Sequence, residues 1–169
     1  MKDSIEKTNV MRLLDQKKIP YRSYCYADTA AVSDAEVAAV LGQDPAQVFK
    51  TLVTVSGKSQ YYVFVIPVEQ ELDLKKAARA VGEKSIAMLR AKELLPLTGY
   101  IHGGCSPIGM KKAFRTVVDA SAQGFETIIF SAGKIGYQVE LAPAALSHFV
   151  RLSFADVTVS QEKEDAAWN

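Results

Sequence analysis

Residues 48–66 read VFKTLVTVSGKSQYYVFVI, and this stretch decides the fold class. Residues 48–55 and 61–66 are two runs rich in β-branched and aromatic side chains, which favour strands. Residues 56–59 between them combine a glycine with polar residues, as is typical of a hairpin turn. The stretch therefore predicts two strands that pair antiparallel.

Helix signals lie on both sides of this hairpin. Residues 4–18 carry an apolar stripe and predict a first helix. Ser33 and Glu36 have the spacing of a capping box, and Gly42 stands where a helix-ending glycine belongs, so a second helix lies between them. Residues 74–81 place apolar side chains at i, i+3, i+4 and i+7, which indicates a third helix.

Further short strands are expected along the chain, at residues 21–26, 116–118, 127–131, 137–141 and 154–159. Pro143 is well placed to open a last helix. The pattern lacks a regular βαβ series, so a doubly wound nucleotide-binding fold is not expected. Residues 1–169 predict one α/β domain with a mixed or largely antiparallel sheet and a polar C-terminal tail over residues 161–169.

Composition narrows the function classes. The chain has 169 residues, of which 49% are hydrophobic and 23% charged, as in a globular protein with a core. The N-terminus does not resemble a secretory signal, and no apolar run reaches the roughly 18 residues that a membrane span needs. Two cysteines are too few for a disulfide framework, so a cytoplasmic protein is expected. A net charge of +1 argues against a dedicated DNA-binding protein.

Lys50 is the most informative single residue. Side chains alternate along a strand, so Lys50 shares a face with Val48 and Leu52. An ammonium group between apolar neighbours is costly when that face is buried. Either the side chain reaches water at the rim of a sheet, or it meets an anion such as a phosphate or a developing oxyanion.

A glycine-rich loop over residues 103–109 is the second feature. Gly103 and Gly104 let a backbone approach a ligand closely and expose N–H donors, while Ser106 adds a hydroxyl and Pro107 stiffens the turn. A tight turn with a purely structural role would explain the same residues. The loop is not a nucleotide-binding P-loop, because a methionine stands where that motif has its lysine.

A second glycine loop joins two of the expected strands over residues 131–136. Ser131 supplies a hydroxyl and Gly133 a flexible backbone, so this loop could line a pocket together with the first. A hairpin loop that needs positive φ angles is an equally good interpretation.

A nucleophile or a metal site is harder to find. His102 and Cys105 could form a catalytic pair, but a buried structural cysteine is the more common role. The histidines and cysteines lack zinc-type spacing, and the carboxylates are scattered. The residues alone thus predict a pocket with a lysine and two glycine loops, and no metal.

Five stretches together resemble the YbaK/EbsC family of aminoacyl-tRNA deacylases, namely residues 47–52, 72–76, 99–112, 131–136 and 139–141. The resemblance implies a single domain with a mixed, barrel-like β-sheet surrounded by helices, similar to the editing insertion of prolyl-tRNA synthetase. It implies no cofactor and no metal. It also implies a substrate, tRNA(Pro) mischarged with cysteine, and prolyl-tRNA synthetase as a possible partner, but neither DNA nor a membrane.

The same resemblance assigns roles to individual residues. It implies that Lys50, Gly103 and Gly104 are catalytic, with the glycine N–H groups holding the oxyanion. The implied substrate-binding residues are Tyr26, Ser106, Pro107, Ser131, Gly133 and Gln138. The cysteine of the substrate is thought to attack its own ester, so the protein needs no nucleophile of its own. Gln138 departs from the family pattern, which has an aspartate there, and Cys105 replaces an aliphatic residue.

Three alternatives to this function remain open. The domain could deacylate another small amino acid on tRNA(Pro), such as alanine. It could be a non-catalytic module that binds tRNA or a synthetase. It could also be a hydrolase with Cys105 as its nucleophile.

Overall fold

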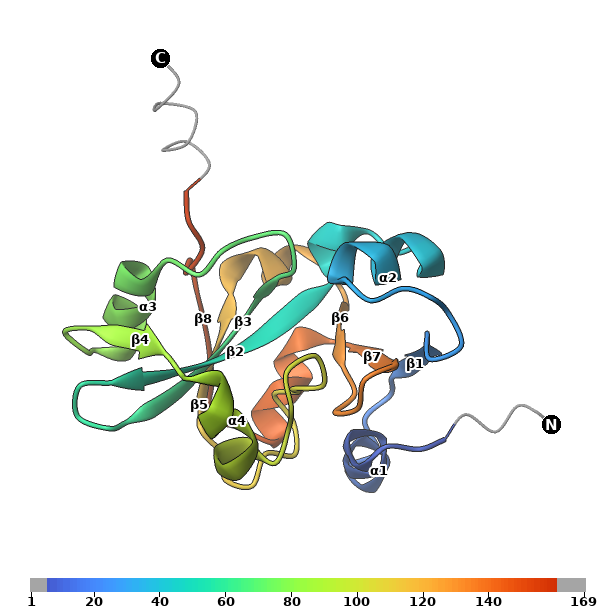
Figure 1. Cartoon of the computed structure of the whole chain (residues 1–169), viewed down its shortest axis with the longest axis horizontal. Coiled ribbons are helices and arrows are strands. Elements are labelled where there is room, and N and C mark those ends of the chain that lie inside the picture. The colour runs from blue at the N-terminus through green and yellow to red at the C-terminus, as the bar shows by residue number, and fades with distance from the viewer. Residues whose placement is uncertain (1–5, 161–169) are drawn as a thin grey trace, which may run out of the picture.

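Two β-sheets that meet near the centre of the molecule carry the fold (Figure 1). The computed structural model describes residues 6–160. The larger sheet has the strand order β4-β2-β3-β5-β8, with β2 (Phe49–Ser56), β3 (Tyr61–Pro67), β4 (Ile86–Met88), β5 (Arg115–Asp119) and β8 (Leu152–Ala155). The smaller sheet has the order β1-β7-β6, with β1 (Arg22–Cys25), β6 (Ile128–Ser131) and β7 (Tyr137–Leu141).

The predicted hairpin is confirmed as the centre of the larger sheet. β2 and β3 pair antiparallel, with Lys50 opposite Ile66 and Val53 opposite Val63. β3 then pairs in parallel with β5, and β5 in parallel with β8, so the larger sheet is mixed. The smaller sheet is antiparallel throughout.

The expectation of a barrel-like sheet is wrong in one respect, because the strands do not close into a barrel. Within residues 6–160, the two sheets are joined by one isolated parallel bridge, between Val48 and Ile129. Beyond that bridge β2 and β6 belong to different sheets, and β4 and β8 remain as edges of the larger one.

In the described part of the chain, four α-helices and three 3-10 turns cover the sheets: α1 (Asn9–Gln16), α2 (Asp34–Leu41), α3 (Leu74–Val81), α4 (Ala91–Thr98), η1 (Pro45–Gln47), η2 (Ala120–Gly124) and η3 (Pro143–His148). The predicted capping box of α2 is confirmed, since Ser33 and Glu36 cap reciprocally and Gly42 ends the helix at φ 67°. α1 is shorter than predicted, because the Thr8 hydroxyl accepts from Met11 N and starts the helix there. Residues 4–5 of that prediction lie outside the described residues, as does the predicted tail over residues 161–169.

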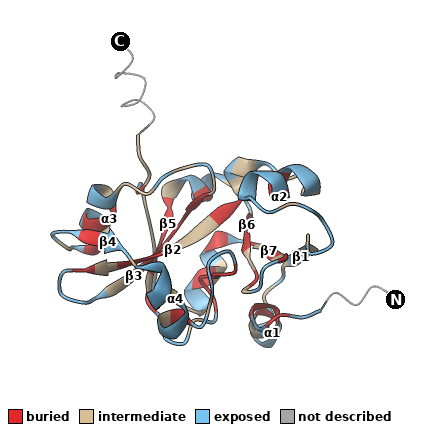
Figure 2. Ribbon diagram, viewed as in Figure 1, coloured by how far each residue is buried: buried red, intermediate tan, exposed pale blue. Residues whose placement is uncertain are grey.

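The main core lies between the smaller sheet, the hairpin and α1, where the buried faces converge (Figure 2). Phe130, Val139, Leu14 and Ile108 are almost completely buried in it. A second cluster packs α3 against the opposite face of the larger sheet, through Ala77, Phe64 and other apolar residues. Burying such side chains stabilises a fold by roughly 1.5–3 kcal/mol each.

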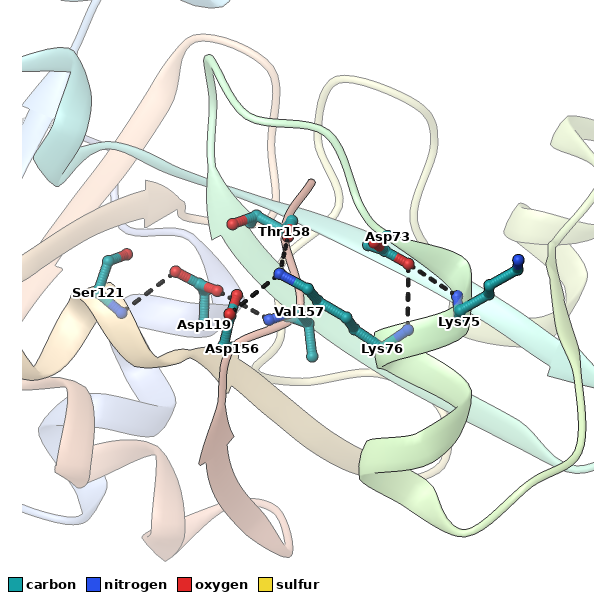
Figure 3. Close-up of polar contacts among 8 residues, drawn as sticks. All are labelled: Asp73, Lys75, Lys76, Asp119, Ser121, Asp156, Val157 and Thr158. Atoms are coloured by element: carbon teal, nitrogen blue, oxygen red, sulfur yellow. Dashed lines mark hydrogen bonds and ion pairs between the residues drawn. The ribbon is translucent and has the colours of Figure 1, made fainter. Parts of the chain in front are cut away.

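The last described residues are anchored differently from the predicted strand at 154–159 (Figure 3). β8 ends at Ala155, and the chain then crosses to α3, where Lys76 Nζ contacts Asp156 Oδ2 at 3.0 Å and Thr158 O at 2.8 Å. The carboxylate of Asp119 accepts from Val157 N at 3.1 Å and from Ser121 N at 3.2 Å. Beyond β8 the backbone pairing continues with a different segment, since Val157 O accepts from Asp73 N at 2.8 Å and Val159 N donates to Glu71 O at 2.9 Å.

Two elements, β4 and α4, occupy residues for which the sequence predicts none. β4 is three residues long and leaves its last two residues exposed, so it has no clear alternation. α4 contains Pro96, a residue that normally ends a helix, and its N-cap Arg90 makes no side-chain capping bond.

Candidate functional site

Lys50 and Ser131 occupy equivalent positions on the two strands that diverge at the sheet junction. The parallel bridge joins Val48 to Ile129, and each of the two residues lies two positions further along its strand. Because side chains repeat their direction every second residue, Lys50 points to the same side as Val48, and Ser131 to the same side as Ile129. The buried cluster of Ala38, Val48 and Ile129 shows that this is the side covered by α2.

Gln138 and Tyr26 join the same face from the smaller sheet. Gln138 on β7 pairs with Ser131 on one side and with Tyr24 on the other, so its side chain lies between theirs. Tyr26 follows β1, and its N–H donates to Gly136 O at 2.7 Å, which continues the pairing. By strand alternation Tyr26 lies on the face of Tyr24. Four predicted site residues thus share one face that extends across the two sheets.

Lys50 is half-buried and has no partner among residues 6–160. Within the described part of the chain, its ammonium group forms neither a hydrogen bond nor an ion pair. A partly desolvated cation without a carboxylate beside it favours an anionic ligand or a developing negative charge.

The two predicted glycine loops do meet. A Cβ built on Gly104 would lie 3.2 Å from the backbone N of Ile135, and one built on Gly103 would lie 3.7 Å from the Ile135 side chain. The first distance is too short for a side chain to fit without moving the second loop. The close approach of the loops therefore requires a glycine at position 104. At position 103 the φ of 89° favours glycine.

The N–H groups of the two glycines differ in availability. Gly104 N donates to Ile101 O at 3.0 Å, so its hydrogen is used within the turn. Gly103 is exposed, and its N–H makes no hydrogen bond with any residue that the structure describes. Of the predicted pair, Gly103 is thus the donor that could face an oxyanion.

Tyr100 fixes the position of both loops. Its hydroxyl donates to Ile108 O at 2.5 Å, and Cβ atoms built on Gly109 or Gly133 would collide with its ring or hydroxyl, at 2.7 and 3.0 Å. Desolvation and the neighbouring Cys105 raise the pKa of Tyr100 to about 12, so the phenol stays neutral. Tyr100 lies within the stretch of residues 99–112, but the sequence assigns it no role, because that role depends on its contacts with Gly109 and Gly133.

Ser106 and Pro107 are buried beneath the loop. Ser106 is completely inaccessible, and its Oγ accepts from Ile108 N at 3.3 Å. Pro107 lines a separate cavity of about 180 Å³ near α1, together with Leu13 and Phe149. A substrate would reach Ser106 only if the loop moved, so both residues support the loop in this conformation.

Cys105 is not placed as a nucleophile. Its side chain is buried, and burial raises the pKa of the thiol to about 12, which leaves no reactive thiolate near neutral pH. His102 is exposed, and within residues 6–160 it makes no hydrogen bond to Cys105. The buried position of Cys105 therefore does not favour a hydrolase that uses it as the nucleophile.

Ser131, Gly133 and Gln138 are held by local contacts. The Ser131 hydroxyl accepts from Gly133 N at 3.1 Å, which shapes the second loop. Gln138 is 7% exposed, and its Oε1 accepts from Nε2 of Gln43 at 2.9 Å. Gln43 follows α2 directly and carries no sequence signal for a site.

A carboxylate network lies beside this face. Glu140 accepts from the hydroxyls of Tyr24 and Thr127. Burial acts to raise the pKa of Glu140, but the hydrogen bonds from Thr127 and Tyr24 outweigh it and hold the pKa below its usual value. Glu140 is thus a structural anion. It borders a cavity of about 550 Å³ that contains none of the predicted site residues.

Other site types find no support among the described residues. No cluster of three or more metal-ligating side chains occurs between residues 6 and 160. Over the same range, none of the helices has the length and apolar character needed to cross a bilayer.

Comparison with known proteins gives one consistent result. A family model described as "Aminoacyl-tRNA editing domain" matches residues 28–149. The Enterococcus faecalis protein named "Putative Cys-tRNA(Pro)/Cys-tRNA(Cys) deacylase EbsC" is 49% identical over 161 residues, which cover 95% of this chain and 98% of that protein. A proline–tRNA ligase of Thermodesulfovibrio yellowstonii is 31% identical over 105 residues, 62% of this chain but 18% of the ligase.

A solved structure shows the same fold. The crystal structure of "a putative trans-editing enzyme for prolyl tRNA synthetase" superposes with a TM-score of 0.76 at 23% identity. The match covers 92% of this chain and 100% of the other.

Proposed function

This chain belongs to the aminoacyl-tRNA editing domain family, and on that premise we propose that it deacylates Cys-tRNA(Pro) in trans. The observation that carries the proposal is the near full-length similarity to the Enterococcus faecalis relative, whose name gives that substrate. The junction between the sheets supplies matching chemistry. Lys50, which has no partner among the described residues, lies level with Ser131, where the second glycine loop begins, and that loop packs against the first.

The reaction needs a nucleophile, and in this proposal the substrate supplies it. In the proposed step, the sulfur of the esterified cysteine attacks its own carbonyl carbon. The bond from that carbon to the ribose oxygen breaks, and this oxygen takes the proton released by the thiol and becomes the ribose hydroxyl. The products are a cyclic thioester of cysteine and free tRNA. The buried state of Cys105 is consistent with a substrate that brings its own thiol.

The protein's part is positioning and charge stabilisation. The N–H of Gly103 holds the carbonyl oxygen as negative charge develops on it. Lys50 stabilises the same charge or the phosphate of the terminal adenosine. Ser131, Tyr26 and Gln138 line the pocket around the aminoacyl group, while Gly104, Gly133, Ser106 and Pro107 keep the two loops in place.

Exposed cations near the first glycine loop supply a contact for the tRNA backbone. Arg90, Lys92, Lys111 and Lys112 are all exposed, and none forms an ion pair with a residue that the structure describes. Lys111 is tied to α4 through its Nζ contact with Pro96 O at 3.3 Å. Because the whole chain carries a net charge of only +1, prolyl-tRNA synthetase is the partner expected to deliver the tRNA, in the cytoplasm.

The test compares release of cysteine and of alanine from tRNA(Pro) by the wild-type protein, by Lys50→Ala and by Lys58→Ala. Lys58 is a matched control, since it is an exposed lysine in the turn of the same hairpin. We expect release of cysteine alone, with kcat/KM lowered by about a hundredfold or more in Lys50→Ala and unchanged in Lys58→Ala.

The other outcomes separate the remaining alternatives. Release of both amino acids would contradict a mechanism that depends on the substrate thiol and would favour a deacylase of broader specificity. Release of neither, with or without prolyl-tRNA synthetase, would leave a binding module with an editing-domain fold.

A further inference from the structure

Gln43 and Gln138 form a pair of side-chain amides at the edge of the candidate site. Nε2 of Gln43 donates to Oε1 of Gln138 at 2.9 Å, although the two residues are 95 positions apart. Gln138 is 93% buried, in the register position between Ser131 and Tyr24. Gln43 is thus the neighbour that determines how the Gln138 amide is turned.

The backbone at Gln43 is fixed on both sides. Gly42 ends α2 in a left-handed conformation, and Gln43 N donates to Ala38 O at 2.8 Å, which closes the helix end. Asp44 then caps the next turn by accepting from Ala46 N at 2.9 Å. A side chain on such a backbone loses little entropy when it holds a partner in place.

Which of the two amides donates and which accepts follows from the cost of leaving buried polar groups unpaired. Oε1 of Gln43 is buried and has no hydrogen-bond partner within the described residues. If both amides were reversed, the buried position would hold an NH₂ group with two unsatisfied donors instead of one oxygen, at a higher cost. The arrangement in which Gln43 donates is therefore favoured.

The free end of Gln138 is consequently its NH₂ group. Nε2 of Gln138 makes no hydrogen bond with any described residue, and it is not among the fully buried unpaired atoms, so it retains contact with solvent. A carboxylate at this position would accept hydrogen bonds, whereas the amide held in this way donates them.

We infer that Gln43 is a positioning residue that turns the NH₂ group of Gln138 toward the aminoacyl group of the substrate. The inference rests on the proposed deacylase function. The NH₂ group faces hydrogen-bond acceptors of that group, the ester carbonyl oxygen or the sulfur, and not its α-ammonium group. Gln43 itself does not touch the substrate.

The test uses Gln43→Ala, Gln43→Glu, Gln138→Ala and the double alanine variant in cysteine release from Cys-tRNA(Pro). A carboxylate at position 43 only accepts, so Gln138 must donate to it and present Oε1 to the substrate. We expect kcat/KM to fall about tenfold in Gln43→Ala and further, about a hundredfold, in Gln43→Glu. A structural role alone would make the isosteric Glu variant the milder one, and that result would overturn the inference.

The double variant checks that Gln43 acts through Gln138. We expect it to be no slower than Gln138→Ala alone, because the group that Gln43 positions is then missing. Multiplied effects of the two single changes would overturn the inference. Melting curves of all variants verify folding.

A readout without substrate separates this inference from the proposed function. In ¹⁵N spectra of the side-chain amides, Gln43→Ala should remove one NH₂ signal pair and shift that of Gln138. An unshifted Gln138 signal would refute the contact. If the Gln138 signal shifts but the wild-type protein releases no cysteine, the contact between the two amides is confirmed. The proposed function is then rejected, and with it the substrate-facing role of Gln138.

Discussion

Replacing Asp119 with alanine should destabilise the protein by about 3 kcal/mol. The carboxylate is 5% exposed and accepts from two backbone N–H groups, those of Ser121 and Val157 (Figure 3). Loss of the cap at Ser121 costs about 1 kcal/mol. Val157 is completely buried, so its N–H would be left without an acceptor at a cost of about 2 kcal/mol. For a chain of this size the melting temperature should fall by about 6–12 °C.

Urea unfolding of three variants measures this. Asp119→Asn keeps one acceptor oxygen and should lose about half as much as Asp119→Ala. Asp156→Ala removes a carboxylate that is 67% exposed in its ion pair with Lys76, and should cost less than about 1 kcal/mol. If Asp119→Ala and Asp156→Ala differed by less than about 0.5 kcal/mol, the buried carboxylate would not be the anchor of the last described residues.

Four further predictions concern the loops and the rim of the site. Gly104→Ala should lower cysteine release by at least about tenfold, because the added Cβ pushes the second loop away, whereas Gly124→Ala, whose Cβ meets nothing within 4 Å, should be neutral in the same assay. At pH 8 iodoacetamide should modify Cys25 in the native protein and spare Cys105, as read by peptide mass. Burial raises the pKa of Cys105 to about 12, so the stability that comes from burying the neutral thiol is complete below about pH 8.5 and is lost as the pH rises toward 12. Cys105→Ala should therefore make the free energy of unfolding, measured by urea titration, decline less over this pH range. Lys112→Glu should raise KM for the tRNA, with a smaller effect at high salt, while kcat stays unchanged.

Local chemistry made part of the fold predictable. The hairpin around residues 56–59 follows from two β-rich runs and a short polar turn, and α2 follows from Ser33, Glu36 and Gly42. Each of these signals involves neighbours in sequence, so the structure around them does not depend on distant parts of the chain.

The arrangement of the two sheets could not be predicted in the same way. A barrel and a pair of sheets contain the same strands, and they differ in whether β2 and β6 stay paired beyond the bridge of Val48 and Ile129. α4 was not predicted, because Pro96 lies inside it and an interior proline argues against a helix.

Part of the candidate site could likewise be predicted from the sequence, and part could not. Lys50 and the glycine loops stand out as residue types that are costly or unusual in their places, and the loops do meet. Gln43 contacts Gln138 from a distant part of the chain, and Tyr100 contacts the second loop at Gly133, so only three-dimensional contacts reveal these two roles.

The pairing of Gln43 with Gln138 has a consequence for how such a domain can evolve. A glutamine codon becomes a glutamate codon by a single base change, and such a change at position 43 would reverse the polarity that residue 138 presents. Substrate preference could then drift between lineages whose pocket-lining residues are identical. In comparing homologues, the identity of a residue at the end of α2 would have to be considered together with that of the pocket itself.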